Sequence, residues 1–367
     1  MSADASPRRG GRPWRLLRGW RRGLALLAGA AALALLAGAA FVTVQWQRRP
    51  DLGAYRPLTL PAAGPASPGA LRVRFAGVST LVFDDGETAW MTDGFFSRPG
   101  AWPTFTGRIA PDPAAVDAAL QRLGVQRLAA VVPLHAHYDH ALDAPLVARR
   151  TGALLVGSPS VRMVGLGQGL PDARIRVVRD GERVQLGRFT LRFIASRHSP
   201  TPLTDGLHVD TIDAPLVPPA RADAWATGET WSLLVHHGGR SLLVQASAGF
   251  RPGALAGQRA ETVLLGIGTL GRKDAAYRDA YWRETVAAVG ARRVLPIHWD
   301  DFWQPLPAGD APLAPMPRLL DDVDGALDDL RQRGATAGVA LQLAPLWQPF
   351  DPFAPAPAAA APSTAKP

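Results

Sequence analysis

The stretch His135-Ala136-His137-Tyr138-Asp139-His140 places three imidazoles and a carboxylate within six residues of a chain that has only 8 histidines. Neutral imidazole is the commonest protein ligand of zinc and similar ions, and aspartate adds a harder oxygen donor. The apolar run 128–134 before the stretch is too short for a helix and predicts a buried strand. Asp143 and Pro145 after it are typical of a helix start. The stretch therefore predicts metal ligands on a strand-to-helix loop, where a rigid scaffold can present them.

Two more histidines stand at the ends of predicted strands, where they would complete two metal sites. His198 follows the strand 189–195 and His298 follows the strand 292–297. A single histidine at a strand end is weak evidence, but both together supply the positions that the histidine stretch leaves open. The predicted ligand sets are His135, His137 and His198 for one ion, and Asp139, His140 and His298 for a second.

Other polar residues are expected to act near the ions or away from them. Asp93 follows the predicted strand 88–92, and we expect it to accept a ring N–H from a ligand and so fix the tautomer. His208 falls in a loop, and His236 and His237 lie near a hairpin turn, so structural roles are expected for these three.

The chain around these residues predicts a domain over 70–347 with two packed sheets covered by helices. A Pro/Ala/Gly linker over 45–69 precedes it, and a disordered Pro/Ala tail over 348–367 follows it. Hydrophobic periodicity and turn residues predict the individual elements. The expected strands are 71–75, 79–83, 88–92, 128–134, 153–156, 175–178, 182–186, 189–195, 231–236, 241–246, 262–267 and 292–297, and the expected helices are 112–123, 143–150, 274–289 and 318–333.

The net charge of +9 is concentrated at the N-terminus and does not indicate a nucleic-acid surface. Residues 1–49 hold nine arginines and one acidic residue, Asp4, which leaves only +1 for residues 50–367. No basic cluster, P-loop or Rossmann glycine pattern occurs in the domain, so we expect no nucleic-acid or nucleotide partner. The chain has no cysteine, which excludes disulfides, thiolate ligands and a lipoprotein anchor.

Residues 23–44 have no charged side chain and are long enough to cross a hydrocarbon core. Seven arginines precede this run within the basic head 1–22, and only Arg48 and Arg49 follow closely. The positive-inside rule then predicts a single-pass anchor in the inner membrane with the domain in the periplasm. Export with cleavage near Ala37-Gly38-Ala39 is the alternative, whereas the match to a twin-arginine signal is poor.

The arrangement of Asp93, the HAHYDH stretch, His198 and His298 resembles the metallo-β-lactamase superfamily over about residues 70–345. The resemblance implies a four-layered αββα sandwich, an α+β fold, here with an N-terminal transmembrane helix. It implies little about the substrate, because one fold hosts many activities. The loop around Tyr138 is most similar to two branches, the N-acyl-phosphatidylethanolamine phospholipase D group and the L-ascorbate-6-phosphate lactonase group.

One position departs from the pattern of that superfamily. Its members usually have an aspartate bridging the two metals after a strand, and here Ser247 occupies the corresponding place in Gln245-Ala246-Ser247-Ala248-Gly249. A serine hydroxyl in place of the usual carboxylate leaves the site with one negative charge fewer. We therefore expect one tightly bound ion, with Zn²⁺ preferred over Mn²⁺ or Fe²⁺, and a second ion that is weak or absent.

These residues predict a membrane-tethered hydrolase that uses a metal-bound hydroxide on an ester, a lactone or a phosphodiester. Asp139 is the expected catalytic residue, orienting or deprotonating the water. Aromatic side chains around 95–105, 225–231 and 299–303 are expected to pack mainly in the core, with some lining an apolar mouth for a small or lipid-like substrate. Ser247 alone favours the alternative, a noncatalytic metal- or ligand-binding domain on the same fold. The sequence identifies no substrate-binding residue.

Overall fold

The computed structural model describes residues 13–201 and 210–355, and the chain divides into two units after Arg48. The first unit contains one helix, α1 (Pro13–Gln47), whose segment Leu24–Gln47 is long and apolar enough to cross a membrane by length and composition. Its described side chains from residue 24 to Val42 are exposed. The predicted apolar run 23–44 thus lies within one continuous helix.

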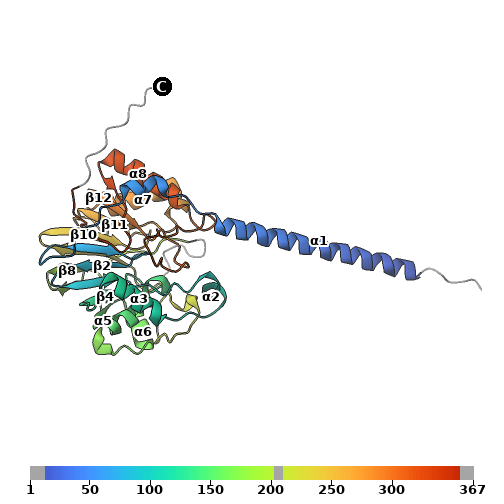
Figure 1. The fold of residues 1–367 in the computed structure, drawn as a ribbon, viewed down its shortest axis with the longest axis horizontal. Coiled ribbons are helices and arrows are strands. Elements are labelled where there is room, and N and C mark those ends of the chain that lie inside the picture. The colour runs from blue at the N-terminus through green and yellow to red at the C-terminus, as the bar shows by residue number, and fades with distance from the viewer. Residues whose placement is uncertain (1–12, 202–209, 356–367) are drawn as a thin grey trace, which may run out of the picture. The chain divides into compact units, whose positions relative to one another are not determined.

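The second unit is built on two seven-stranded sheets, and both mix antiparallel hairpins with parallel strands (Figure 1). In the first sheet β1 to β3 pair antiparallel, and β4, β5 and β6 continue parallel to β3. In the second sheet β7 to β10 pair antiparallel, and β11, β12 and β13 continue parallel to β10. The first sheet has the order β14 (Pro349–Phe350), β1 (Arg72–Phe75), β2 (Leu81–Asp84), β3 (Ala89–Thr92), β4 (Ala130–Val132), β5 (Leu154–Gly157) and β6 (Ile175–Val177). The second has the order β13 (Ala340–Leu341), β12 (Arg293–Ile297), β11 (Thr262–Gly266), β10 (Arg240–Gln245), β9 (Trp231–His237), β8 (Phe189–Ala195) and β7 (Arg183–Leu186).

Helices cover the outer faces of both sheets, so the domain has the predicted architecture of two packed sheets covered by helices, and its fold is mixed α/β. In Figure 1 α3, α5 and α6 lie on one side of the sheets and α7 and α8 on the other. The elements involved are α2 (Ala101–Thr106), α3 (Pro113–Leu123), α5 (Ala144–Thr151), α6 (Pro159–Gly167), α7 (Ala275–Trp282) and α8 (Val323–Ala337), with a single turn, α4 (Tyr138–Ala141), in the histidine stretch.

The core follows from the alternation of side chains along the strands. On β2, Leu81 and Phe83 are fully buried in the cluster between the sheets, whereas Val82 is buried in the cluster beneath the helices. On the other sheet Leu191 and Phe193 of β8 contribute to the inter-sheet cluster. Both faces of the first sheet are therefore covered, as its parallel strands require.

Several helix ends follow their sequence signals. Asp112 accepts hydrogen bonds from Ala114 N and Ala115 N at the start of α3, and Gly124 closes that helix in the left-handed conformation. The predicted helix 274–289 is instead divided, because α7 ends at Trp282 and a π-helical turn, Arg283–Ala287, follows it. The predicted helix 318–333 begins only at Val323, and the sequence did not predict α2 or α6.

The predictions for the two flanking segments, the linker 45–69 and the tail 348–367, are wrong in part. Pro349–Phe350 form β14 rather than disordered tail, and Phe350 is fully buried against β1. The remainder of that tail, 356–367, lies outside the described residues. In the predicted linker the short helix η1 (Gly53–Leu58) carries the buried Tyr55, whose hydroxyl donates to Asp328 Oδ1 at 2.7 Å. The domain therefore extends further at both ends than composition indicated.

Candidate metal centre

The predicted ligands all lie just beyond the carboxyl ends of strands. The histidine stretch follows β4, His198 follows β8 and His298 follows β12. His298 N donates to Val78 O at 2.7 Å, and this hydrogen bond ties the second sheet's ligand to the β1–β2 turn of the first sheet. Ligands from the two sheets meet at one edge of the sandwich.

The first predicted set is brought together in full. The ligand atoms of His135, His137 and His198 lie within 4.8 Å of one another. His135 Nε2 and His137 Nδ1 are 3.1 Å apart and face each other. Burial, together with neighbouring imidazoles, lowers the pKa of His137 to about 4 and that of His198 to about 3. These imidazoles are neutral at neutral pH, the form that binds a metal.

The surroundings of His198 fix which of its two ring nitrogens has the free lone pair. His198 Nδ1 lies 2.8 Å from Ser199 O, and since a carbonyl only accepts, Nδ1 is the protonated nitrogen and Nε2 is free. His137 Nε2 lies 2.9 Å from Thr227 Oγ1 while Nδ1 faces His135. The free Nε2 of His198 belongs to the first set, whose ligand atoms lie within 4.8 Å of one another.

The second predicted set is also assembled. The ligand atoms of Asp139, His140 and His298 lie within 4.8 Å of one another, and Asp139 Oδ2 is 3.2 Å from His298 Nε2 and 3.5 Å from His140 Nε2. Burial alone would raise the pKa of Asp139, but the imidazoles of His140 and His298 outweigh it and lower that pKa. His140 Nε2 is buried without a hydrogen-bond partner among the described residues. A cation between these atoms would satisfy that nitrogen and the carboxylate together.

Asp93 makes the contact predicted for it. Its Oδ2 accepts from His140 Nδ1 at 2.8 Å and from Ser79 Oγ at 2.5 Å, and its Oδ1 accepts from Leu134 N at 2.9 Å. The fully buried carboxylate holds a proton on His140 Nδ1, so Nε2 is the unprotonated nitrogen of the neutral ring. Burial alone would lower the pKa of His140, but the carboxylates of Asp93 and Asp139 outweigh it and raise that pKa. Asp93 and His298 both have left-handed backbone conformations, with φ of 53° and 60°. Strain of this kind concentrates at functional sites.

Ser247 contacts the loop of a ligand. Its Oγ accepts from Ser199 N at 2.8 Å, and Ser199 directly follows His198. The neighbouring Gln245, fully buried at the end of β10, donates to Ser196 Oγ at 3.0 Å and to Gly249 O at 2.7 Å. Segment 245–249 therefore braces the His198 loop, a role that the sequence did not reveal.

Asp300 and Asp301, beside His298, are buried, and among the described residues neither hydrogen-bonds to a ligand imidazole. Asp300 accepts from Val78 N at 2.8 Å and forms a completely buried ion pair with Arg98 at 2.6 Å. Asp301 pairs with Arg49 at 2.7 Å. Both carboxylates stabilise the loops that present His298.

The predicted aromatic groups differ in burial, and Trp299 and Phe302 are half-buried. Phe95, Phe96, Trp225, Trp231 and Trp303 are buried, whereas Trp102 and Phe105 are exposed.

Among the remaining histidines, His237 contacts Asp85 at 2.9 Å, His236 is exposed, and His208 lies outside the described residues. Sequence reasoning missed Thr227. Its hydrogen bond with His137, which forms only in the folded chain, is what identifies it as a residue of the site.

Comparisons with known proteins find a sequence match over part of the chain and solved structures with similar folds. No family model matches the sequence. A UPF0173 metal-dependent hydrolase from Chelativorans sp. (strain BNC1) is 32% identical over 79 residues, which cover 22% of this chain and 34% of that protein. The chain thus spans about a third of the length of the curated relative it matches.

Solved structures with similar folds share little sequence with the chain. The metallo-β-lactamase fold protein YhfI from Bacillus subtilis is 12% identical, with a TM-score of 0.41 over 79% of this chain and 95% of that one. Zn²⁺-bound PqqB from Methylobacterium extorquens is 12% identical, with a TM-score of 0.43 over 76% and 89%. CmlA, a diiron β-hydroxylase from Streptomyces venezuelae, is 17% identical, with a TM-score of 0.43 over 76% and 53%. These similarities do not assign an activity or a metal to this chain.

Proposed function

We propose that this protein is a metal-dependent hydrolase of the metallo-β-lactamase fold. The observation that carries the proposal is the pair of complete ligand sets at one edge of the sandwich. Neutral imidazoles such as those of His137 and His198 are donors that zinc prefers. His140 Nε2 is buried without a hydrogen-bond partner among the described residues. We propose Zn²⁺ as the ion, with Mn²⁺ and Fe²⁺ as alternatives.

A metal ion held by such ligands lowers the pKa of water and polarises the oxygen of a scissile carbonyl or phosphoryl group. The chain's own residues supply the rest. His135, His137 and His198 add no charge, so the site remains attractive to an anionic or polarised oxygen. Asp139 is the ionised carboxylate of the site, and its low pKa keeps it an acceptor that orients a nucleophilic water.

The proposed reaction is hydrolysis of an ester, a lactone or a phosphodiester. We further propose that the apolar helix tethers the enzyme to the inner membrane, with the domain in the periplasm. The arginines of the basic head support this orientation. Ser247 supports an asymmetric centre, since it supplies no charge to help retain a second cation.

The test combines metal analysis of the full-length chain with assays on a 4-nitrophenyl ester, a lactone and bis(4-nitrophenyl) phosphate. His135→Ala and His198→Ala should each abolish turnover and remove most of the bound metal. His236→Ala, a change of the same type at an exposed position, is the matched control and should keep both. Full turnover in either ligand variant would contradict the assignment. Bound metal without turnover on any substrate would favour the noncatalytic alternative.

A further inference from the structure

Among the described residues from Arg49 onward, four large apolar side chains are exposed, and two of these lie on α2. Trp102 is 78% exposed and Phe105 is 57% exposed. They are three residues apart, so they lie on one face of the helix. No charged residue occurs in α2, and the hydroxyls of Thr104 and Thr106 donate to the carbonyls four residues before them at 2.7 and 2.8 Å. The α2 face, defined by Trp102 and Phe105, is therefore apolar, and the helix satisfies its own hydroxyl groups.

Neighbouring aromatic rings connect the α2 face to the second ligand set. The ring centroids of Phe105 and Trp303 are 5.1 Å apart, and those of Trp303 and Phe302 are 4.6 Å apart. The Phe302 ring in turn lies 5.7 Å from the ring of His298. Trp303 Nε1 also donates to the hydroxyl of Tyr138, in the histidine stretch, at 3.0 Å. Two aromatic side chains thus link the α2 face to a predicted metal ligand.

The loop that carries these rings is bound to the start of the domain. Arg49 Nη2 pairs with Asp301 Oδ2 at 2.7 Å, and Asp301 Oδ1 accepts from Trp303 N at 3.0 Å. The Asp301 side chain is fully buried, so salt screens this pair only weakly. Arg49 follows the apolar segment Leu24–Gln47 by two residues, and two residues span at most about 7 Å. Only this short distance along the chain separates the apolar segment from a side chain bound to the loop of Trp303 and His298.

The end of the apolar segment has the residues of a membrane interface. Leu24–Gln47 has 24 residues, which as a helix span about 36 Å and exceed a hydrocarbon core of about 30 Å. Trp46 is of the type that lies among lipid headgroups, and Arg48 and Arg49 follow it. A bilayer that holds this segment would have its surface near Arg49.

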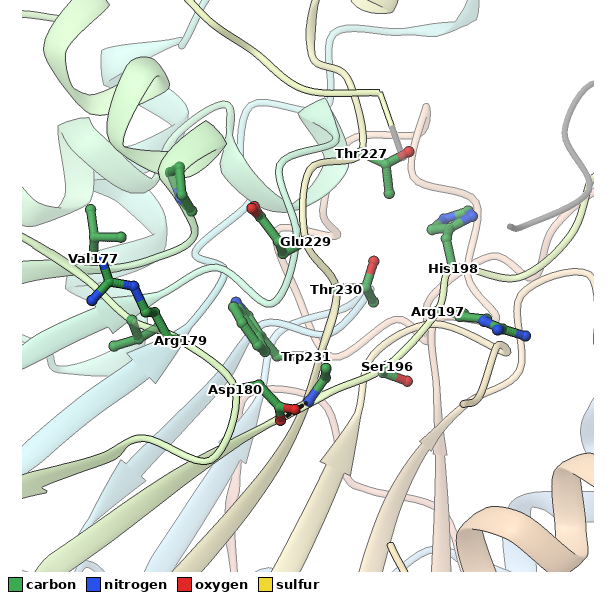
Figure 2. Close-up of a pocket in the computed structure, with 13 residues that line it drawn as sticks. Val177, Arg179, Asp180, Ser196, Arg197, His198, Thr227, Glu229, Thr230 and Trp231 are labelled. Carbon is green, nitrogen blue, oxygen red and sulfur yellow. Dashed lines mark hydrogen bonds between the residues drawn. The ribbon is translucent and has the colours of Figure 1, made fainter. Parts of the chain in front are cut away.

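The surroundings of the first ligand set are charged, in contrast to the α2 face. A cavity of about 370 Å³ has His198 in its wall. Figure 2 shows Arg179, Asp180 and Arg197 around this cavity, and all three residues are exposed. Transferring such charges from water into an apolar layer would be costly. The mouth of this cavity is therefore suited to water, whereas the α2 face is suited to a lipid surface.

We propose that the α2 face rests in the interfacial layer of the bilayer that holds the apolar helix, and that the substrate is an amphiphile drawn from that bilayer. The inference rests on the membrane tether and the hydrolase activity proposed above. Aromatic rings are favoured among lipid headgroups, and an indole N–H there can donate to lipid or water oxygens. The contact of Phe105 with Trp303 then places the second ligand set beside the bilayer surface. An acyl chain can remain in the lipid while the scissile bond reaches the metal centre.

The chain has no cysteine, so a single introduced cysteine can report lipid contact. The full-length chain with Trp102→Cys, labelled with the environment-sensitive dye NBD, is reconstituted in phosphatidylcholine vesicles. The label should lose fluorescence when the vesicles include a phosphatidylcholine with a nitroxide near its headgroup. Glu87→Cys, at an exposed position in the β2–β3 turn, is the matched control and should not be quenched.

Flotation of the vesicles shows separately whether the chain is held in the bilayer. Flotation without quenching at residue 102 would overturn the lipid surface alone, and loss of flotation would overturn the tether and the surface together. A label at residue 102 whose emission is blue-shifted but not quenched would indicate that a second copy of the chain covers α2, which also overturns the proposal.

Turnover gives a readout of the substrate class. The ratio of kcat/KM for 4-nitrophenyl palmitate in the vesicles to that for 4-nitrophenyl acetate in water should fall about tenfold in Trp102→Glu, the equivalent of losing one large buried apolar side chain. Ala335→Glu adds the same charge at an exposed position of α8 and should keep the native ratio. An unchanged ratio in Trp102→Glu would overturn the amphiphilic substrate. Quenching at residue 102 without turnover of either ester would refute the hydrolase function and leave the lipid surface established.

Discussion

Asp93→Asn is the most informative single change, because it alters a proton position and leaves the shape of the site intact. Asparagine tolerates the left-handed backbone that Asp93 adopts. Its Oδ1 can keep the hydrogen bond from Leu134 N, which directs Nδ2 toward His140 Nδ1. Nδ2 is a donor, so His140 must move its proton to Nε2. That move removes the lone pair that the second ligand set requires.

The magnitude follows from the contact that is replaced. The bond between Asp93 Oδ2 and His140 Nδ1 is 2.8 Å long, and both side chains are fully buried. Loss of such an outer partner typically lowers metal affinity about 10- to 100-fold, or about 1.4 to 2.7 kcal/mol. Competition with a chromophoric zinc chelator measures both binding events. The zinc affinity of the site formed by Asp139, His140 and His298 should fall, while that of the site formed by His135, His137 and His198 should change less than about threefold.

The control for this experiment is Ser79→Ala. It removes the hydroxyl that donates to the same carboxylate oxygen but leaves Asp93 available to accept from His140. We expect little change in metal affinity for Ser79→Ala. If Asp93→Asn binds zinc at both sites with native affinity, the tautomer argument is refuted.

Four further predictions concern metal content, stability and topology. Ser247→Asp should raise the metal content toward two ions per chain by elemental analysis, unless the native protein already keeps two ions through dialysis. Arg98→Met should lower the free energy of unfolding in urea by about 3 to 5 kcal/mol, since it leaves a buried carboxylate unpaired, whereas Arg150→Met breaks an exposed ion pair and should cost under about 1 kcal/mol. Burial raises the pKa of Asp143 to about 6, so its contribution to the free energy of unfolding is greatest at low pH and is lost as the pH rises through 6. In urea melts between about pH 4 and 6, Asp143→Asn should therefore reduce the fall of the free energy of unfolding with rising pH. A reporter fused after Pro367 should be active only if it is a periplasmic type, and alkaline carbonate should leave an anchored chain in the membrane pellet.

The sequence predicted the two ligand sets because their signals are local. Three histidines and an aspartate fall within His135–His140, and strand periodicity places that stretch, His198 and His298 at strand ends. In parallel strands of one sheet, such ends share an edge. The contact between Asp93 and His140 was predictable for the same reason, since β3 and β4 are neighbours.

The parts that sequence reasoning missed depend on long-range contacts. Phe350 belongs to the core only because β14 pairs with β1, and a two-residue strand has no periodicity to detect. Gln245 and Ser247 support His198 through a loop about 50 residues earlier in the chain. Left-handed backbones at Asp93 and His298 are imposed by their surroundings, because neither residue favours that conformation as glycine does.

Thr227 shows why a residue that contacts a predicted metal ligand can be invisible in one sequence. It lies next to Gly228, whose positive φ of 59° and contact with Ser160 turn the chain just before β9. An added Cβ at Gly228 would lie 2.6 Å from Ser160 Cβ, so only glycine lets this segment pass α6 and run beside the metal loop. That passage is what carries Thr227 to His137. A lone threonine in an irregular segment gives no such signal, because its contact with His137 is a property of the closed fold and not of its neighbours in the chain.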